Sequence, residues 1–259
     1  MFRLTREVRF ALNPDPDDQL NQKPANSFGG YPSLTGLGRY YTIRITLAGD
    51  LDPRTSYLLN IKAVDALVRQ RVIPRMQNYS GSAEALVREL YSLLFNAWPG
   101  AALHQLQVIL TPTLNLSLIA SEFPMVRLSQ KFEFSASHRL HSAQLSDEEN
   151  LQCFGKCNNP QGHGHNYEVE VTLRASDANP TLLKCLPSFE RTVAETVIDA
   201  FDHRNLNVEV PEFRELIPTV ENIAMVIYRM LKPKFQSEKA QLASVTVWET
   251  PKTWCEYSE

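Results

Sequence analysis

Hydrophobic and polar residues alternate along several short segments of the chain, as they do in strands that bury one face. One segment of the second half instead carries apolar residues at helical spacing, and a second is predicted to be helical because Thr219, directly after Pro218, is a good N-cap. In the first of them, Phe189, Val193, Val197 and Phe201 form one stripe that should face a sheet. The patterns predict, in chain order, strands at 127–136 and 165–175, helices at 187–201 and 219–232, and strands at 242–249 and 252–258.

The first half repeats this order, and several of its segments align with segments of the second. The aligned pairs are Leu4–Phe10 with Leu128–Phe134, Gly36–Leu47 with Gly162–Leu173, and Val108–Pro112 with Val247–Pro251. We therefore expect an α+β protein of two tandem domains, 1–123 and 127–259. Each should place two helices on one face of an antiparallel sheet.

Composition excludes several classes of protein. The chain has 259 residues, of which 43% are hydrophobic and 21% charged, which is typical of a globular protein. Its net charge of −3 gives no attraction to phosphate backbones, so we expect no nucleic acid partner. There is no apolar run of the length that a membrane span needs, and the charged start lacks the apolar region of a secretory signal. We expect a cytoplasmic protein with reduced thiols and no membrane partner.

The reactive side chains are concentrated in the second half. All four cysteines and five of the six histidines lie there. Where the second half has reactive groups, the first has Leu37 for His163, Arg39 for His165, Leu110 for Glu249, and Gln77-Asn78 for Asp202-His203. The long loop at 13–38 corresponds to the loop that carries the chemistry in the second half. We expect the first domain to keep the fold without metal or catalytic residues.

Three histidines form a candidate metal site. His163 and His165 flank Gly164 at the start of a strand, so their side chains point to the same side. His138 ends the preceding strand, and the three imidazoles can meet if the two strands pair. Three neutral histidines with a free fourth position are typical of catalytic Zn²⁺. An isolated His-x-His motif is also found by chance in exposed loops.

Cys157 lies six residues before His163 in a loop that contains Gly155, Asn159-Pro160 and Gly162. Such a loop could fold the thiol back towards the metal, and a nearby Lys156 or Zn²⁺ would favour the thiolate. The alternatives are a small buried hydrophobic residue, or a metal pair with Cys153.

Two acidic groups complete the candidate chemistry. Asp202 precedes His203 at a helix end, where the carboxylate could raise the basicity of the imidazole for acid–base work. Glu249, on a strand beside Trp248, suits hydrogen bonding to a flat heterocycle with several donors. A solvated helix end and an exposed strand residue remain the alternatives for the two positions.

Together, FSASHRLHS, LSDEENLQCFGKCNNPQGHGHNY, FDHRNLN, PTVENIA and VWET resemble the 6-pyruvoyl-tetrahydropterin synthase family. The resemblance covers 127–259. Five residues separate Cys157 from His163, which is closest to the pyruvoyl-forming branch; the 6-carboxy-tetrahydropterin synthases usually have three.

The resemblance implies the tunnelling fold, whose domains assemble into barrels with active sites between neighbours. It implies zinc ligands at His138, His163 and His165, a general base at Cys157, other catalytic members at Asp202 and His203, a pterin anchor at Glu249, and a segment beside the pterin at Thr219, Val220 and Glu221. Val220 departs from the threonine that the family often has there.

The implied reaction eliminates triphosphate from 7,8-dihydroneopterin triphosphate in a homo-oligomer, a trimer or a dimer of two-domain chains. Lys156 and Arg139 could attract the triphosphate, and the first domain could supply a site wall around Asn60 or only complete the barrel. A carboxy-forming synthase, a non-catalytic pterin-binding protein and a zinc hydrolase are the alternative functions.

Overall fold

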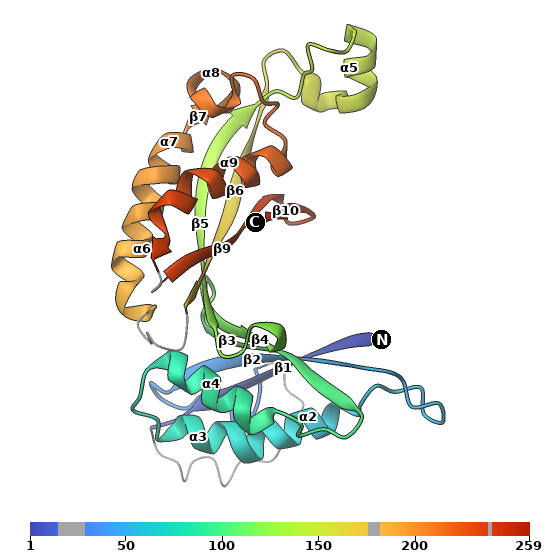
Figure 1. Cartoon of the computed structure of the whole chain (residues 1–259), viewed down its shortest axis with the longest axis vertical. Coiled ribbons are helices and arrows are strands. Elements are labelled where there is room, and N and C mark those ends of the chain that lie inside the picture. Colours follow the sequence, from blue (N-terminus) through green and yellow to red (C-terminus); the bar gives the residue numbers. More distant parts are fainter. Residues whose placement is uncertain (15–28, 176–181, 238–239) are drawn as a thin grey trace. The chain divides into compact units, whose positions relative to one another are not determined.

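The computed structural model describes residues 1–14, 29–175, 182–237 and 240–259, so most of the loop at 13–38 lies outside the described residues. The chain divides into two compact units (Figure 1). The first consists mainly of Met1–Leu128, and the second comprises Ser129–Arg174 and Leu182–Glu259.

Unit 1 is a four-stranded antiparallel sheet with helices inserted between its second and third strands. The strands lie side by side in chain order: β1 (Phe2–Leu12), β2 (Arg39–Gly49), β3 (Ala101–Thr111) and β4 (Leu114–Ile119). The helical segments are α2 (Ile61–Leu67), the π-helical η1 (Val68–Val72), α3 (Ile73–Gln77) and α4 (Ala83–Leu94), with a short 3-10 turn, η2 (Ala120–Glu122), after β4.

Unit 2 contains the same order of elements with additional short segments. Its main strands are β5 (Val126–His138), β6 (His163–Ala175), β9 (Ala240–Thr250) and β10 (Thr253–Tyr257), adjacent in that order. Two-residue strands pair with two of them: β7 (Arg204–Asn205) with β5 and β8 (Gln236–Ser237) with β9. The helical segments are α5 (Asp147–Phe154), η3 (Gly155–Asn158), η4 (Leu183–Cys185), α6 (Leu186–Val193), η5 (Ala194–Ile198), α7 (Asp199–Phe201), α8 (Leu206–Glu209), η6 (Pro211–Phe213), α9 (Val220–Leu231) and η7 (Lys232–Lys234).

The six elements predicted for the second half are present at the predicted places. α6, η5 and α7 follow one another without a break over the predicted first helix, and its apolar stripe is buried. Thr219 caps α9, as expected, because its side chain accepts a hydrogen bond from the backbone N–H of Asn222. Each unit taken alone has an open sheet, with β1 an end strand of the first and β10 of the second. The sequence did not reveal α5 or α8.

Alternation along β5 and β6 places two kinds of side chain on opposite faces of the sheet. Phe134 and Tyr167 stack with their ring centroids 4.9 Å apart, and the edge of Phe201 from α7 packs against Phe134. These rings belong to the buried face that the helices of unit 2 cover. On the other face, the Ser135 hydroxyl donates to the side-chain oxygen of Asn166 at 2.7 Å. This division decides where each functional group of the second half can act.

None of the described helices combines the length and apolar character needed to cross a membrane.

Candidate metal centre and catalytic groups

Three imidazoles meet where β5 ends and β6 begins. His138 is the last residue of β5, and His163 and His165 open β6 on the same face. The Nε2 atoms of His138 and His163 are 3.1 Å apart, and the His165 ring lies edge-on to both. The structure thus brings together the three histidines that the sequence pattern placed on adjacent strands.

Glu249 of β9 joins this cluster. Its Oε1 atom lies 3.2 Å from Nε2 of His138 and 3.3 Å from Nε2 of His165. One donor atom from each of the four side chains lies within 4.8 Å of all the others. The strand order β5-β6-β9 explains the placement, because Glu249 follows Trp248, which pairs with Glu168 a few residues beyond the two β6 histidines.

The ring of His138 is held in one orientation by groups on two other elements. Its Nδ1 lies 2.7 Å from the carbonyl oxygen of Pro218, just before α9, and 3.4 Å from the hydroxyl of Tyr167. A carbonyl only accepts, so Nδ1 must carry the proton and donate it. In a neutral ring this leaves the lone pair of Nε2 directed into the cluster, which is the arrangement of a metal-ligating histidine with an outer-shell partner.

Burial favours the neutral imidazoles that metal binding requires. It lowers the pKa of His165, and it lowers the pKa of His163 together with the charges of the neighbouring histidines. The pKa of Glu249 is lowered, chiefly by its close contact with His138 and further by its proximity to His165 and His163, against the opposing effect of burial. Neutral imidazoles around an ionised carboxylate form a donor set for a cation.

The donor set fits a metal ion. Nε2 of His165 is buried and has no hydrogen-bond partner, because its approach to Glu249 lacks hydrogen-bond alignment; Nδ1 of His163 is also buried without a partner. A buried polar nitrogen without a partner is costly. A cation among the converging lone pairs would satisfy Nε2 of His165, and three imidazoles with one carboxylate suit zinc.

Cys157 sits in η3, in the loop that joins α5 to β6. Its backbone carbonyl accepts a hydrogen bond of 2.9 Å from the N–H of Leu140, two residues after His138. The loop therefore does fold back towards the end of β5. Cys157 is half-buried, whereas Cys153 is exposed on α5.

Asp202 and His203 are bound to each other and to the outer edge of β5. Nδ1 of His203 donates to Asp202 Oδ2 at 2.7 Å, while the other Asp202 oxygen accepts from the N–H of Ser135. Hydrogen bonds from the Ser135 backbone and the His203 side chain lower the pKa of Asp202. The His203 backbone has φ +58, a conformation that non-glycine residues rarely adopt, and its side chain is 83% exposed. The pair thus presents an oriented imidazole to solvent.

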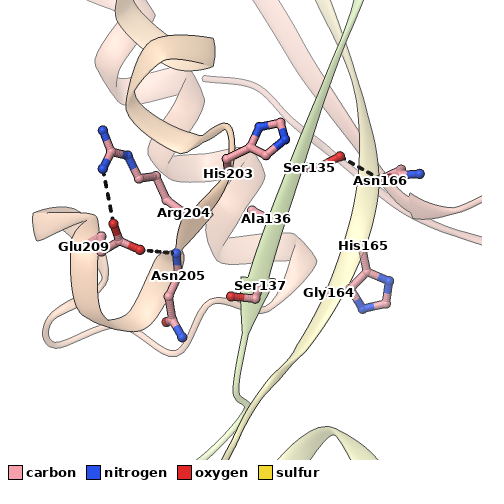
Figure 2. Close-up of a pocket in the computed structure, with 10 residues that line it drawn as sticks. All are labelled: Ser135, Ala136, Ser137, Gly164, His165, Asn166, His203, Arg204, Asn205 and Glu209. Carbon is pink, nitrogen blue, oxygen red and sulfur yellow. Dashed lines mark hydrogen bonds and ion pairs between the residues drawn. The ribbon is translucent and has the colours of Figure 1, made fainter.

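An open cavity of about 500 Å³ lies beside His203, on the sheet face that carries Ser135 and Asn166 (Figure 2). Its lining includes Ser137, Asn205 and His165, and in Figure 2 the ring of His165 points away from that of His203. Among the described residues, no hydrogen bond or ion pair joins the Cys157 thiol to Asp202 or His203. Within one chain, the imidazole cluster and the Asp202–His203 pair therefore face opposite ways.

The remaining predicted residues lie in two places. Thr219, Val220 and Glu221 begin α9 directly after Pro218, so they adjoin the His138 ring; Val220 is buried and Glu221 exposed. Asn60 lies in unit 1, where its side chain caps α2 by accepting from the N–H of Lys62 at 3.0 Å. Asn60 also lines an open cavity of about 360 Å³ in that unit, together with Phe2, Leu4, Leu51, Tyr57 and Ile61.

Sequence reasoning missed the outer-shell groups of the cluster. Pro218 contributes only its backbone carbonyl, which no residue pattern reveals. The one signal for its position was Thr219, a helix cap, because a cap at Thr219 places Pro218 directly before α9, near the sheet.

The sequence profile of the 6-pyruvoyl tetrahydropterin synthase family matches residues 127–259, which include the whole imidazole cluster. The chain belongs to the 6-pyruvoyl tetrahydropterin synthase family. It is 45% identical over 107 residues to the human 6-pyruvoyl tetrahydrobiopterin synthase, covering 41% of this chain and 74% of that protein. It is 26% identical over 154 residues to the 6-carboxy-5,6,7,8-tetrahydropterin synthase of Haemophilus influenzae, covering 52% of this chain and all of that protein.

A solved structure resembles the whole chain in fold alone. The uricase of Arthrobacter globiformis matches with a TM-score of 0.51 and 7% identity, over 100% of this chain and 93% of that one. At that identity the likeness extends to the fold of both halves and to nothing chemical.

Proposed function

We propose that this chain is a zinc-dependent lyase that eliminates triphosphate from 7,8-dihydroneopterin triphosphate, the reaction of the pyruvoyl-forming branch of its family. The observation that carries the proposal is the convergence of His138, His163 and His165 beside the Cys157 loop. The five residues between Cys157 and His163 favour this branch over the carboxy-forming one. The higher identity to the human protein than to the bacterial carboxy-forming one agrees with that choice.

The three imidazoles would hold Zn²⁺ through the nitrogens that face the cluster, and Glu249 would bind the pterin ring through its donor groups. Bound zinc would supply Lewis-acid polarisation of the substrate's side-chain oxygens, which makes the adjacent C–H more acidic. Cys157, as thiolate, would take the proton from that carbon. His203, oriented by Asp202, would act as its proton partner while the C–O bond to triphosphate breaks.

The opposite orientation of the two groups bears on how the site is completed. Cys157 lies by the imidazole cluster, whereas the His203 ring is directed into the cavity on the other face of the sheet. We infer that the thiol of one chain works with the Asp202–His203 pair of a second copy. This requires a homo-oligomer, in which two-domain chains would form trimers or dimers.

The first half is proposed to be a tandem copy that has kept the fold and lost the chemistry, with domains at 1–123 and 127–259. In support, unit 1 has the element order of unit 2. Asn60 remains a candidate wall residue for a site in the assembly. Asn60→Ser retains a helix cap, so a fall in pterin affinity in Asn60→Ser would support contact with substrate, and unchanged kinetics would leave Asn60 only as the cap of α2.

The test is to incubate the full-length, zinc-loaded chain with 7,8-dihydroneopterin triphosphate under reducing, anaerobic conditions. Products are resolved by chromatography and mass spectrometry, with Cys157→Ala as the inactive variant and Cys153→Ala as the matched control. A pyruvoyl pterin with free triphosphate supports the proposal. A carboxy-pterin with acetaldehyde assigns the chain to the other branch, and unchanged substrate from zinc-replete protein makes it a binding protein.

Two variants separate the remaining readings of the site. Activity that survives Cys157→Ala would favour a zinc hydrolase, in which water is the nucleophile and no thiol base is needed. Glu249→Gln keeps the shape of the side chain and removes its charge. If Glu249 anchors the pterin, this variant keeps its zinc and raises KM; if Glu249 is a metal ligand, zinc is lost.

A further inference from the structure

Arg139, the residue after His138, connects three segments of unit 2. Its side chain reaches the loop that carries Cys157. Nε donates to the backbone oxygen of Asn158 at 3.1 Å, and Nη2 donates to the side-chain oxygen of the same residue at 3.1 Å. The planar guanidinium thus holds both acceptors of the residue that follows the thiol.

The backbone of Arg139 is fixed as firmly as its side chain. Its N–H donates to the side-chain oxygen of Asn207 at 2.7 Å, and its carbonyl accepts from the amide of Asn207 at 3.0 Å. Asn207 lies in α8, four residues after His203. The backbone from which the guanidinium extends is therefore hydrogen-bonded to the segment that carries the Asp202–His203 pair.

Neighbouring contacts hold the same loop in place. Nδ1 of His141 lies 3.1 Å from the Asn158 side-chain oxygen, and the Leu140 N–H donates to the Cys157 carbonyl. At the far end of the loop, Gly162 has φ +72, and a Cβ there would lie 2.9 Å from the carbonyl oxygen of His138. The loop is in close contact with the end of β5 on both sides of the thiol.

These contacts direct Nε and Nη2 of Arg139 to the loop, although sequence proximity alone suggested that Arg139 could attract the triphosphate. The side chain is half-buried and three of its hydrogen-bonding directions are taken by Asn158 and His141. Its charge is directed to the loop.

We propose that Arg139 is a positioning residue, which clamps Asn158 and so fixes the position of the Cys157 thiol relative to the imidazole cluster. The proposal deepens the proposed function and rests on it for the catalytic use of Cys157, but the clamp itself can be tested without turnover. A lysine at this position would keep the charge and lose the two-point grip.

The first measurement is the alkylation rate of Cys157 by iodoacetamide in the zinc-loaded full chain. Trypsin cuts after Lys156, so Cys157 and Cys153 fall in different peptides and mass spectrometry follows each separately. Cys153, exposed four residues earlier, is the internal reference. Arg139→Gln and Arg139→Lys should each raise the ratio of the Cys157 rate to the Cys153 rate severalfold, because the released loop exposes a half-buried thiol. Arg191→Gln, an exposed change on α6, should leave the ratio unchanged.

Asn158→Ala tests the clamp from the other side while leaving Arg139 in place. It should raise the ratio as Arg139→Gln does, and the double variant should add little to either change. In turnover assays, Arg139→Gln should lower kcat by about tenfold or more with KM within about twofold, as expected for a misplaced catalytic group.

Two results would overturn the proposal. An unchanged alkylation ratio in both Arg139→Gln and Asn158→Ala would show that the clamp does not hold the thiol. A rise in KM in Arg139→Gln, with kcat and the alkylation ratio unchanged, would instead show that Arg139 binds the triphosphate. If the chain had no synthase activity at all, the alkylation ratio would still report on the clamp, so failure of the proposed function is distinguishable.

Discussion

The Nδ1 atom of His138 donates a hydrogen bond of 2.7 Å to the carbonyl oxygen of Pro218, and this contact decides which nitrogen of the ring faces the metal cluster. With its proton committed to Pro218, the neutral ring directs the Nε2 lone pair at His163 and Glu249. Lone pairs that face one another are unfavourable unless a proton or a metal ion lies between them.

That arrangement predicts stoichiometric zinc binding that depends on each imidazole. His165→Ala should lose zinc because it removes a donor whose Nε2 has no other partner. Zinc is measured by atomic emission after dialysis against a weak chelator. His104→Ala, in the first half, is the control and should retain wild-type zinc. Full occupancy in His165→Ala would remove this residue from the ligand set.

Gly162 and Gly155 allow a matched test of the Cys157 loop. Both have positive φ, which glycine adopts far more readily than residues with a Cβ, so alanine at either position strains the backbone. Only at Gly162 would the new Cβ meet the His138 carbonyl, at 2.9 Å; at Gly155 it meets open space. Gly162→Ala should therefore lower zinc affinity and turnover as well as stability, whereas Gly155→Ala should lower stability alone.

Urea unfolding gives the stability of both variants, and zinc titration gives the affinity. Equal zinc affinities in the two variants would mean that the approach of the loop to His138 does not constrain the metal site.

Asp202 predicts a pH dependence of stability with a definite sign. Its folded pKa is lowered, chiefly by the hydrogen bond from the Ser135 N–H and then by His203. A carboxylate with a depressed folded pKa contributes stability above its unfolded pKa, near 3.9, and loses that contribution as pH falls through the lower folded value. Asp202→Asn should therefore be less stable than wild type at neutral pH, and the gap should close in acid.

The measurement is the free energy of unfolding of wild type and Asp202→Asn across the acidic range and at neutral pH. Asp147→Asn, on exposed α5, is the control for a general charge effect. A stability gap that is constant with pH would contradict a role for the ionised carboxylate.

The sequence predicted the main elements of the second half because burial imposes clear periods on strands and helices. The stripe from Phe189 to Phe201 is a full helical face, and apolar and polar residue types alternate from Tyr167 to Ala175 in the strand that begins with His163. α5 was missed although Ser146 and Glu149 form a capping box at its start, because its residues have no apolar stripe.

The part of the candidate site that depends on residue type and on the pairing of neighbouring strands could be predicted from the sequence. The meeting of the three imidazoles follows from alternation on two adjacent strands. The contact of Glu249 with them requires the order β6-β9, which joins strands far apart in the sequence. The directions in which the Cys157 and His203 side chains point depend on which face or edge of β5 their loop or helix packs against. Local sequence does not encode this packing.

A site shared between copies is tested most directly by asking whether Cys157 and His203 can act together from different chains. Cys157→Ala and His203→Ala chains are co-expressed with different affinity tags and purified through both tags, so that every assembly contains each variant. Both variants should be inactive alone, and the mixed, zinc-replete assembly should regain a substantial fraction of wild-type triphosphate release. The double variant should regain none. Mixed assemblies that bind zinc and stay inactive would contradict a site shared between copies.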